Sequence, residues 1–529
     1  MLHPRLYLAI MTRIRNGNGV EEEENQLLRS DSGTEGSVTD DHEDGGTTGS
    51  GASISESAST DGARSSRVTP GGVFAITVLC AANLLNYMDR FTVAGVLVQV
   101  QKFYGIAGDD AAGGLLQTVF VLVYMVCAPV FGYLGDRHSR KWIVIFGLVV
   151  WSAAVLASSF VPAEMFWLFV VCRAVVGLGE ASYATVVPSI IGDLFPDLRT
   201  RSFMLMLFYF AVPVGSGLGF VVGAMVSGWA DDWRWGVRFT PALALVCLAL
   251  VLLLREPARQ RDDVSATHSA AAADTSLSGG LAVFLDDLRS LGSNRTYVWS
   301  TVAFTGVVFV TGSLSWWAVN LVKYALELHP DSPMEKSTVS LVFGAITCVS
   351  GIVGVSAGSV WASIWKRTNK RADALVCAWG ALLAVPFLFA SLVALTFSIP
   401  AAFVLMFFTV TLLCLNWAVV VDMMLYVVVP SRRSTATAFQ MLSSHLLGDA
   451  FSPYLIGEVS NLIRSETTRG AHFYSLQYAL FASTFVLLLA GGAFLLASFY
   501  VVADWKTAEQ HMLHPTVYSV DNGIGEHDE

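Results

Sequence analysis

The sequence predicts an all-α membrane protein in which twelve transmembrane helices form two halves of six. Of the 529 residues, 54% are apolar and only 14% are charged, whereas an ordinary soluble domain has about 25% charged residues. Apolar stretches recur at the length of roughly 20 residues that a helix needs to cross a hydrocarbon core about 30 Å thick. One long polar segment separates the first six stretches from the last six.

The predicted spans divide the chain into five regions. The first six spans are 73–101, 112–134, 141–161, 165–190, 203–229 and 236–254. The last six are 297–326, 337–364, 373–393, 399–429, 435–462 and 473–502. We therefore expect a disordered tail at 1–69, a six-helix half at 70–254, a linker at 255–296, a second half at 297–503 and an acidic tail at 504–529.

Most of the negative charge lies in the tails. The formal net charge is −10, and residues 1–67 together with 503–529 carry an excess of 11 acidic side chains, which leaves the body near neutrality. The segment 16–69 has almost no aromatic residues, so it cannot bury enough apolar surface to offset the entropy of ordering. We expect these tails to be cytoplasmic and nucleic acid not to be a partner.

The distribution of basic residues sets the expected orientation. Loops after the even-numbered predicted spans carry more than twice as many Lys and Arg residues as loops after the odd-numbered spans. Because Lys and Arg are retained on the cytoplasmic side, both termini should be cytoplasmic.

Cofactor chemistry has little support in the sequence. All seven cysteines lie in or beside apolar segments and none forms a CxxC pair, so we expect no structural disulfide and no metal site. We also find no nucleotide-binding loop and no nucleophile elbow. The sequence therefore argues against an enzyme or an ATP-driven pump, and we expect no cofactor.

Ionisable residues inside the predicted spans mark a candidate pathway, because a charge within a membrane is costly unless it faces a partner or a cavity. Asp89 and Arg90 lie roughly 16 Å from the outer end of span 1, and Arg173 lies roughly 12 Å from the outer end of span 4. We expect an Asp89–Arg173 ion pair.

Glu180 is placed to share that site with Arg173. It follows Arg173 by seven residues, which puts both side chains on one face of a helix. Burial favours a neutral carboxyl and a nearby arginine favours a carboxylate, so small movements of Arg173 could load or release a proton. The alternative is a static network that only packs spans 1 and 4.

The second half offers weaker candidates. Asn416, His445 and Asp449 lie in spans 10 and 11 and could form the facing wall of a binding site. A histidine in a span can instead be satisfied by a neighbouring backbone or hydroxyl group, so a structural role for His445 remains open.

The stretch GYLGDRHSRK at 132–141 resembles the loop signature of the major facilitator superfamily, although Ser139 replaces the second glycine of the pattern. We expect it to pair with the other half and close the cytoplasmic side. A role in positive-inside topology alone is the alternative. The residues of this candidate gate are Gly132, Asp136, Arg137, Arg140 and Lys141.

Five further segments resemble the spinster family within that superfamily. They are NYMDRFTVAGV (86–96), GEASYATVVPSIIGDLF (179–195), FYFAVPVGSGLG (208–219), SRRSTATAFQ (431–440) and SHLLGDAFSPYLIG (444–457), and the resemblance covers about 70–505. It implies the major facilitator fold and proton-coupled transport of lysolipids, either lysophospholipids leaving lysosomes or sphingosine 1-phosphate crossing the plasma membrane.

The resemblance also implies that Asp89 and Arg173 form a proton-responsive switch. On this interpretation Asp89 and Glu180 exchange protons, Arg90 or Arg173 holds a phosphate, and Asn416 and His445 contribute to the binding wall. The expected partners are the lysolipid, protons and membrane lipids, and we expect a monomer. An organic-anion or sugar carrier, or a lipid sensor without net flux, remains an alternative.

A short motif in the N-terminal tail bears on location. Glu23, Leu27 and Leu28, in EENQLL, form an acidic dileucine pattern of the kind that sorting adaptors recognise. Such motifs also arise by chance. With this motif we expect the late endosome or lysosome rather than the plasma membrane.

Overall fold

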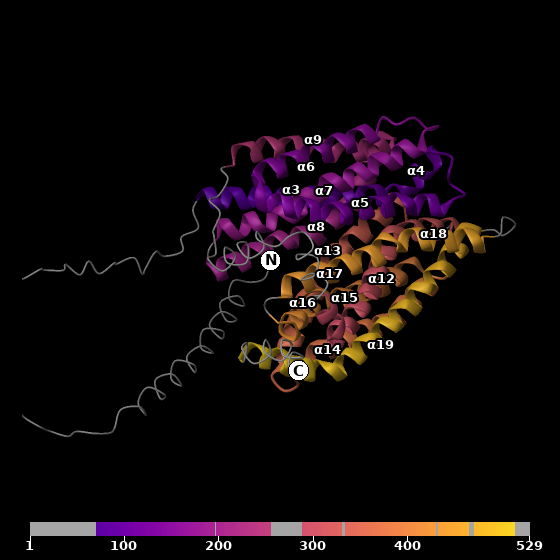
Figure 1. Cartoon of the computed structure of the whole chain (residues 1–529). Helices are drawn as coiled ribbons and strands as arrows, with labels where there is room; N and C mark the ends of the chain where they lie inside the picture. Colours follow the sequence, from indigo (N-terminus) through magenta and orange to yellow (C-terminus); the bar gives the residue numbers. More distant parts are fainter. Residues whose placement is uncertain are drawn as a thin grey trace, which may run out of the picture. The chain divides into compact units, whose positions relative to one another are not determined.

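The computed structural model describes residues 70–195, 197–254, 288–330, 334–429, 432–464 and 470–513, and these residues form helices joined by turns, with no strand among them. Figure 1 shows the helices of the first half, in indigo to magenta, gathered into one group and those of the second half, in orange to yellow, gathered into another. The predicted all-α fold with two halves is confirmed.

The first half contains six long helices and one short helix. They are α3 (Pro70–Gly95), α4 (Leu97–Phe103), α5 (Asp110–Arg137), α6 (Arg140–Ser158), α7 (Phe166–Leu194), α8 (Leu198–Ala230) and α9 (Trp233–Leu253). The predicted first span, 73–101, is divided at Val96 between α3 and α4.

The second half is less regular. Its elements are α12 (Arg295–Leu328), α13 (Lys336–Lys366), α14 (Ala372–Ala394), α15 (Ile399–Cys414), α16 (Asn416–Val427), α17 (Arg433–Ser444), η2 (His445–Ala450), α18 (Ser452–Ile463) and α19 (Ala471–Leu513). Helix α19 continues past its predicted end at 502, so the first residues of the predicted 504–529 tail are helical.

Eleven helices of the described part are long and apolar enough to cross a membrane, with α15 and α16 counted as one. The eleventh predicted span, 435–462, is not among these eleven, and it is not one uninterrupted α-helix. This segment is divided into α17, the π-helix η2 and α18. Pro453 in the first turn of α18 has no backbone N–H to donate, so a break before it is tolerated.

Several helices begin at an acidic or amide side chain that accepts a hydrogen bond from the backbone. Asp109 Oδ1 accepts from Ala112 N at 3.0 Å at the start of α5, and Asn294 Oδ1 accepts from Tyr297 N at 2.9 Å at the start of α12. These caps satisfy N–H groups that the first turn leaves without a helical partner.

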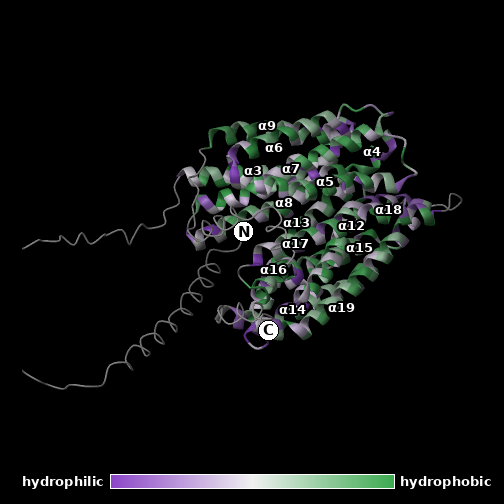
Figure 2. Cartoon of the chain, in the orientation of Figure 1, coloured by the Kyte–Doolittle hydropathy of each residue, from purple (hydrophilic) through white to green (hydrophobic). Residues whose placement is uncertain are grey.

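The outer surface of the bundle is apolar. Figure 2 shows hydrophobic residues along most of the length of the helices and hydrophilic residues concentrated toward their ends. Large side chains such as Trp167 and Phe485 are 69% and 62% exposed. A soluble monomer rarely exposes so extensive an apolar surface, whereas a membrane protein faces lipid with it.

The two halves approach closely where α8 meets α13. A methyl group added at Gly217 would overlap the carbonyl oxygen of Gly344, and one added at Gly344 would overlap the carbonyl oxygen of Gly217. Small residues at such positions let helix backbones come into van der Waals contact.

Candidate functional site

The predicted ion pair between span 1 and span 4 is present. Arg173 Nη1 of α7 lies 3.7 Å from Asp89 Oδ2 of α3, and both side chains are almost completely buried. Thr240 Oγ1 donates to Asp89 Oδ1 at 2.7 Å, and Trp151 Nε1 donates to Asp89 Oδ2 at 3.3 Å. The Asp89 carboxylate is therefore held by helices α6, α7 and α9 together.

A second ion pair lies beside the first. Arg90 Nη2 of α3 donates to Glu180 Oε2 of α7 at 2.9 Å. Glu180 is 2% exposed and Arg90 is 11% exposed. The sequence placed Glu180 on the same helix face as Arg173, but the cation that it contacts comes from α3.

Aromatic rings of α3 and α5 surround the two arginines. The Arg90 guanidinium lies 4.8 Å from the centroid of the Phe120 ring, and the Arg173 guanidinium lies 5.1 Å from it. Arg90 also lies 4.9 Å from the Tyr87 ring and 5.5 Å from the Tyr124 ring. These contacts hold both cations by attraction to the faces of the rings. Sequence reasoning missed them, because nothing distinguishes these aromatics from others in apolar spans.

Glycines bring the neighbouring helices close to the charged residues of α7. A methyl group at Gly177 would overlap the backbone carbonyl of Phe120 in α5, and one at Gly179 would lie 2.7 Å from the backbone nitrogen of Trp151 in α6. Without these glycines, the Phe120 ring and the Trp151 indole could not reach the two ion pairs.

Several polar atoms in this cluster have no hydrogen-bond partner in the described part of the chain. They are Arg90 Nε, Arg173 Nε, Arg173 Nη2 and Glu180 Oε1. A buried polar atom without a partner costs free energy. The cluster therefore has N–H groups available to donate to a ligand and one carboxylate oxygen available to bind a proton.

In the second half, His445 lies beside Asp449 within η2. His445 Nδ1 lies 3.1 Å from each carboxylate oxygen of Asp449. The Asp449 carboxylate is within electrostatic range of the Tyr87 hydroxyl of α3. The Cα and Cβ atoms of Asp449 pack against Gly312 of α12, and π-helical turns of this kind are frequent at functional sites.

Asn416 is buried at the junction of α15 and α16. Its Nδ2 donates to the carbonyl of Leu413 at 3.2 Å, and its Oδ1 has no partner in the described residues. The structure gives Asn416 a local backbone contact and does not bring it into contact with His445, so its role in binding remains a prediction.

The contacts described for the predicted gate lie within the first half. Arg140 forms an ion pair with Asp193 of α7, Lys141 Nζ donates to the carbonyl of Leu254 at 2.6 Å, and the Arg137 guanidinium stacks 4.3 Å from the centroid of the Tyr133 ring. A side chain at 132 would have open space around it. The side chain of Asp136 lies outside the described part. A contact of this loop with the second half remains a prediction.

The two halves are joined at the opposite end of α5. Arg464 forms an ion pair with Asp110, and Ser460 Oγ donates to Asp110 Oδ2 at 2.8 Å. Asn461 Nδ2 donates to Asp109 Oδ1 at 2.7 Å. These contacts link the start of α5 in the first half with the end of α18 in the second.

A buried lysine adds a further link at that side. Lys323 Nζ of α12 donates to the carbonyl of Gly95 at 2.5 Å, where α3 ends. Trp316 Nε1 donates to the carbonyl of Gly113 at 3.1 Å. Sequence reasoning did not identify this closed side, since the partners are distant in the chain.

Comparisons with known proteins identify the family. The model of the Major Facilitator Superfamily matches residues 79–453. Protein spinster homolog 1 of Homo sapiens is 45% identical over 460 residues, covering 84% of this chain and 84% of that protein. Protein spinster of Drosophila melanogaster is 40% identical over 495 residues, covering 84% and 79%. The chain belongs to the spinster family of the Major Facilitator Superfamily.

Solved structures show the same fold. A bacterial homolog of the human lysosomal transporter spinster, in an inward-facing and unoccupied conformation, matches with a TM-score of 0.68 and 19% identity over 82% of this chain and 98% of that chain. A D-xylose-proton symporter matches with a TM-score of 0.57 and 15% identity over 80% and 97%. This spinster-family chain is therefore an integral membrane transporter of the major facilitator fold.

Proposed function

We propose that this chain transports lysolipids by alternating access coupled to protons, and that it exports them from lysosomes. The observation that carries the proposal is the double ion pair, in which Asp89 and Arg90 are adjacent on α3 and their partners Arg173 and Glu180 lie on α7. Two acids and two bases buried side by side form a network whose contacts must change when one acid gains a proton.

Glu180 connects protonation with substrate binding. Its Oε2 accepts from Arg90 and its Oε1 has no partner, so a proton has an unoccupied oxygen to bind. A neutral Glu180 would hold Arg90 much more weakly, because the charge assistance of the hydrogen bond is lost. Arg90, the more exposed of the two arginines, would then be available to bind a phosphate.

A lysolipid fits the chemistry of the surroundings. Its phosphate needs a guanidinium, which Arg90 and Arg173 provide, and its polar head can contact His445 and Asp449 on the facing wall. Its single chain needs an apolar path, which the hydrophobic helices of the second half supply. A soluble organic anion or a sugar has no long alkyl chain and would not need an apolar path.

The contacts between the halves support alternating access. Asp110 and Arg464 join the halves at one side, and Lys141 Nζ donates to the backbone carbonyls of Leu252 and Leu254 in the first half. With both termini in the cytoplasm, as proposed from the loop charges, the side joined by Asp110 and Arg464 would face the lumen, and this conformation would be inward-facing. In the outward-facing conformation, the candidate gate would contact the second half.

The proposed location rests on the tail motif. Glu23, Leu27 and Leu28 lie outside the described residues, so the motif is argued from the sequence alone. Sorting adaptors would bind the tail from the cytoplasm, and the transporter would act as a monomer within membrane lipids.

Flux in proteoliposomes tests the proposal. The purified full chain should transport labelled lysophosphatidylcholine or sphingosine 1-phosphate, and an imposed pH gradient should change the rate. A large excess of soluble organic anions or sugars should not compete. Competition by those solutes would favour a carrier for them, and binding without any flux would favour a lipid sensor.

A further inference from the structure

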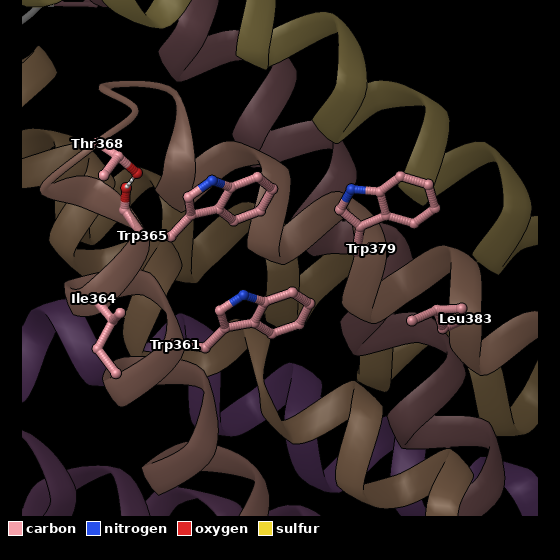
Figure 3. Close-up of a pocket in the computed structure, with 6 residues that line it drawn as sticks. All are labelled: Trp361, Ile364, Trp365, Thr368, Trp379 and Leu383. Atoms are coloured by element: carbon pink, nitrogen blue, oxygen red, sulfur yellow. Dashed lines mark hydrogen bonds between the residues drawn. The ribbon is translucent and has the colours of Figure 1, made fainter.

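A pocket lined mainly by aromatic and aliphatic side chains opens on the outer surface of the second half, away from the double ion pair. It lies between the end of α13 and the start of α14 and has a volume of about 510 Å³. Figure 3 shows Trp361 and Trp365 on one helix facing Trp379 and Leu383 on the next. The lining residues are Trp361, Ile364, Trp365, Thr368, Trp379 and Leu383.

Four of the six lining residues lie on one helical face. Residues 361, 364, 365 and 368 follow the i, i+3, i+4, i+7 pattern, so they form one face of α13 and its continuing turn. The Trp361 and Trp365 rings are parallel, with centroids 6.0 Å apart and an interplanar angle of 7°. Thr368 Oγ1 donates to the carbonyl of Trp365 at 3.1 Å, which fixes the turn at the mouth of the pocket.

The depth of the pocket matches the border between lipid head groups and chains. Trp361 precedes the end of α13 by five residues and Trp379 follows the start of α14 by seven, which places both within roughly 10 Å of the helix ends. Tryptophan is enriched at this depth, where an amphipathic ring meets both water and hydrocarbon.

Basic residues flank the pocket-lining residue Thr368 in the chain. Arg367, Lys370 and Arg371 are exposed in the turn between α13 and α14. The neighbouring Lys366 is already engaged, because its Nζ lies 2.5 Å from Asp373 Oδ2. Lys370 lies over the ring of Trp505, and neither Arg367 nor Arg371 has a side-chain partner in the described part.

We propose that this pocket binds an anionic diacyl phospholipid of the surrounding membrane, with its phosphate on Arg367 and Arg371 and one acyl chain among the indoles. Guanidinium groups bind phosphate through two parallel hydrogen bonds. Basic clusters at the cytoplasmic ends of transmembrane helices attract anionic lipid head groups. A second copy of this chain is a poor occupant, because the same three positive charges would face one another.

Lipid retention by the purified full chain tests the head-group contacts. The protein is equilibrated in detergent with equal amounts of phosphatidylglycerol and phosphatidylcholine, and the lipid that stays bound is counted by native mass spectrometry. The wild type should retain phosphatidylglycerol preferentially. The pair R367Q and R371Q should weaken that retention by about an order of magnitude.

The matched control removes two other bases. Lys102 of α4 and Arg289 near the start of α12 are exposed, so the pair K102Q and R289Q lowers the net charge equally. This pair should retain phosphatidylglycerol as the wild type does. If both double variants lost phosphatidylglycerol equally, the lipid would be attracted by surface charge in general, and the proposal would be overturned. Equal retention of phosphatidylglycerol and phosphatidylcholine by the wild type would overturn it as well.

The indole contacts have their own test. W379L should reduce retained phosphatidylglycerol several-fold, whereas W167L, which alters an exposed tryptophan of α7 far from the pocket in the chain, should not. Added lysophosphatidylglycerol, with one chain, should displace the bound lipid poorly. Displacement by an equal amount of the lysolipid would identify a cargo site instead and would contradict the proposal.

Discussion

Glu180 forms its ion pair with Arg90 of α3 at 2.9 Å and not with Arg173, the arginine of its own helix. Arg173 pairs with Asp89 instead. Asp89 and Arg90 are adjacent in α3, and they form ion pairs with Arg173 and Glu180, which are seven residues apart in α7. The crossed arrangement means that protonation of either acid affects both helices.

Glu180→Gln should imitate the protonated acid permanently. The amide cannot ionise, so it should leave Arg90 more available to a phosphate at every pH. We expect lysophospholipid binding to become less dependent on pH while coupled transport falls by at least about tenfold, as when general acid–base groups are removed. Binding and flux measured across a range of pH check this.

The matched control for that variant is Glu327→Gln. Glu327 is exposed and pairs with Lys336 outside the charged cluster, so its loss should change neither binding nor coupling. If Glu180→Gln kept the pH profile of the wild type for both binding and flux, Glu180 would have no part in proton coupling.

Asp89→Asn should abolish the response to a pH gradient while the protein still folds and binds lysolipid. The amide keeps the size of the side chain and can still meet Thr240 and Trp151, but it cannot ionise. Proteoliposome flux with and without a gradient measures the effect. Thr240→Val, which removes one hydrogen bond to Asp89 and no charge, should keep a gradient response.

Full gradient-driven transport by the Asp89→Asn protein would contradict the role assigned to Asp89. Glu180 would then become the leading proton carrier, since it is the other buried acid of the cluster.

Arg173→Ala should destabilise the protein in a pH-dependent way. Removal of one partner leaves Asp89 as a buried charge without a cation, a change that costs about 3–5 kcal/mol when the remaining group stays ionised. At acidic pH Asp89 can take up a proton and remove the charge. The loss of thermal stability should therefore be larger at alkaline than at acidic pH, and uptake should lose its normal pH optimum.

Thermal unfolding of the detergent-solubilised variant at several pH values measures this difference. A loss of stability that is the same at every pH would indicate that Arg173 acts through packing on Phe120 and not through the charge of Asp89.

The sequence predicted those parts of the site that follow from helix depth and spacing. Asp89 and Arg173 are polar residues in apolar spans at similar depth, so their pairing could be derived. The partner of Glu180 could not, because the choice between Arg90 and Arg173 depends on how α3 is rotated against α7. The rotation of α7 in the bundle depends on close contacts such as those of Gly177 with α5 and Gly179 with α6, which composition does not show.

The second half was predicted less well for a similar reason. A hydropathy pattern measures length and not hydrogen-bond register, so 435–462 was indistinguishable from a continuous span. The wider turns of η2 are accompanied by tertiary contacts such as that of Thr118 with the carbonyl of Ala450, which hydropathy does not show.

Replacement of Leu27 and Leu28 by alanine should move the protein from lysosomes toward the cell surface, because adaptors would lose the apolar part of the motif. Microscopy of the tagged full chain measures the distribution. Flux in proteoliposomes should remain unchanged, which separates sorting from transport. If the variant stayed in lysosomes, the dileucine pattern would have no part in sorting.

Gly344→Ala should disfavour the conformation described here, since its new methyl group would overlap the carbonyl oxygen of Gly217 where the two halves touch. Overpacking of this kind costs about 1–3 kcal/mol, enough to shift the ratio of two conformations by about tenfold. Spin labels at Lys102 and Leu462, placed on the two halves near the Asp110–Arg464 side, should show a larger population at long distance.

Gly492→Ala provides the matched control for that measurement. Gly492 also lies within a long apolar helix, α19, but a methyl group there meets no neighbouring atom within 4 Å. Its distance distribution should equal that of the wild type. If Gly344→Ala gave the same distribution as Gly492→Ala, the Gly217–Gly344 contact would have to persist through the transport cycle, and the halves would pivot about it instead of separating there.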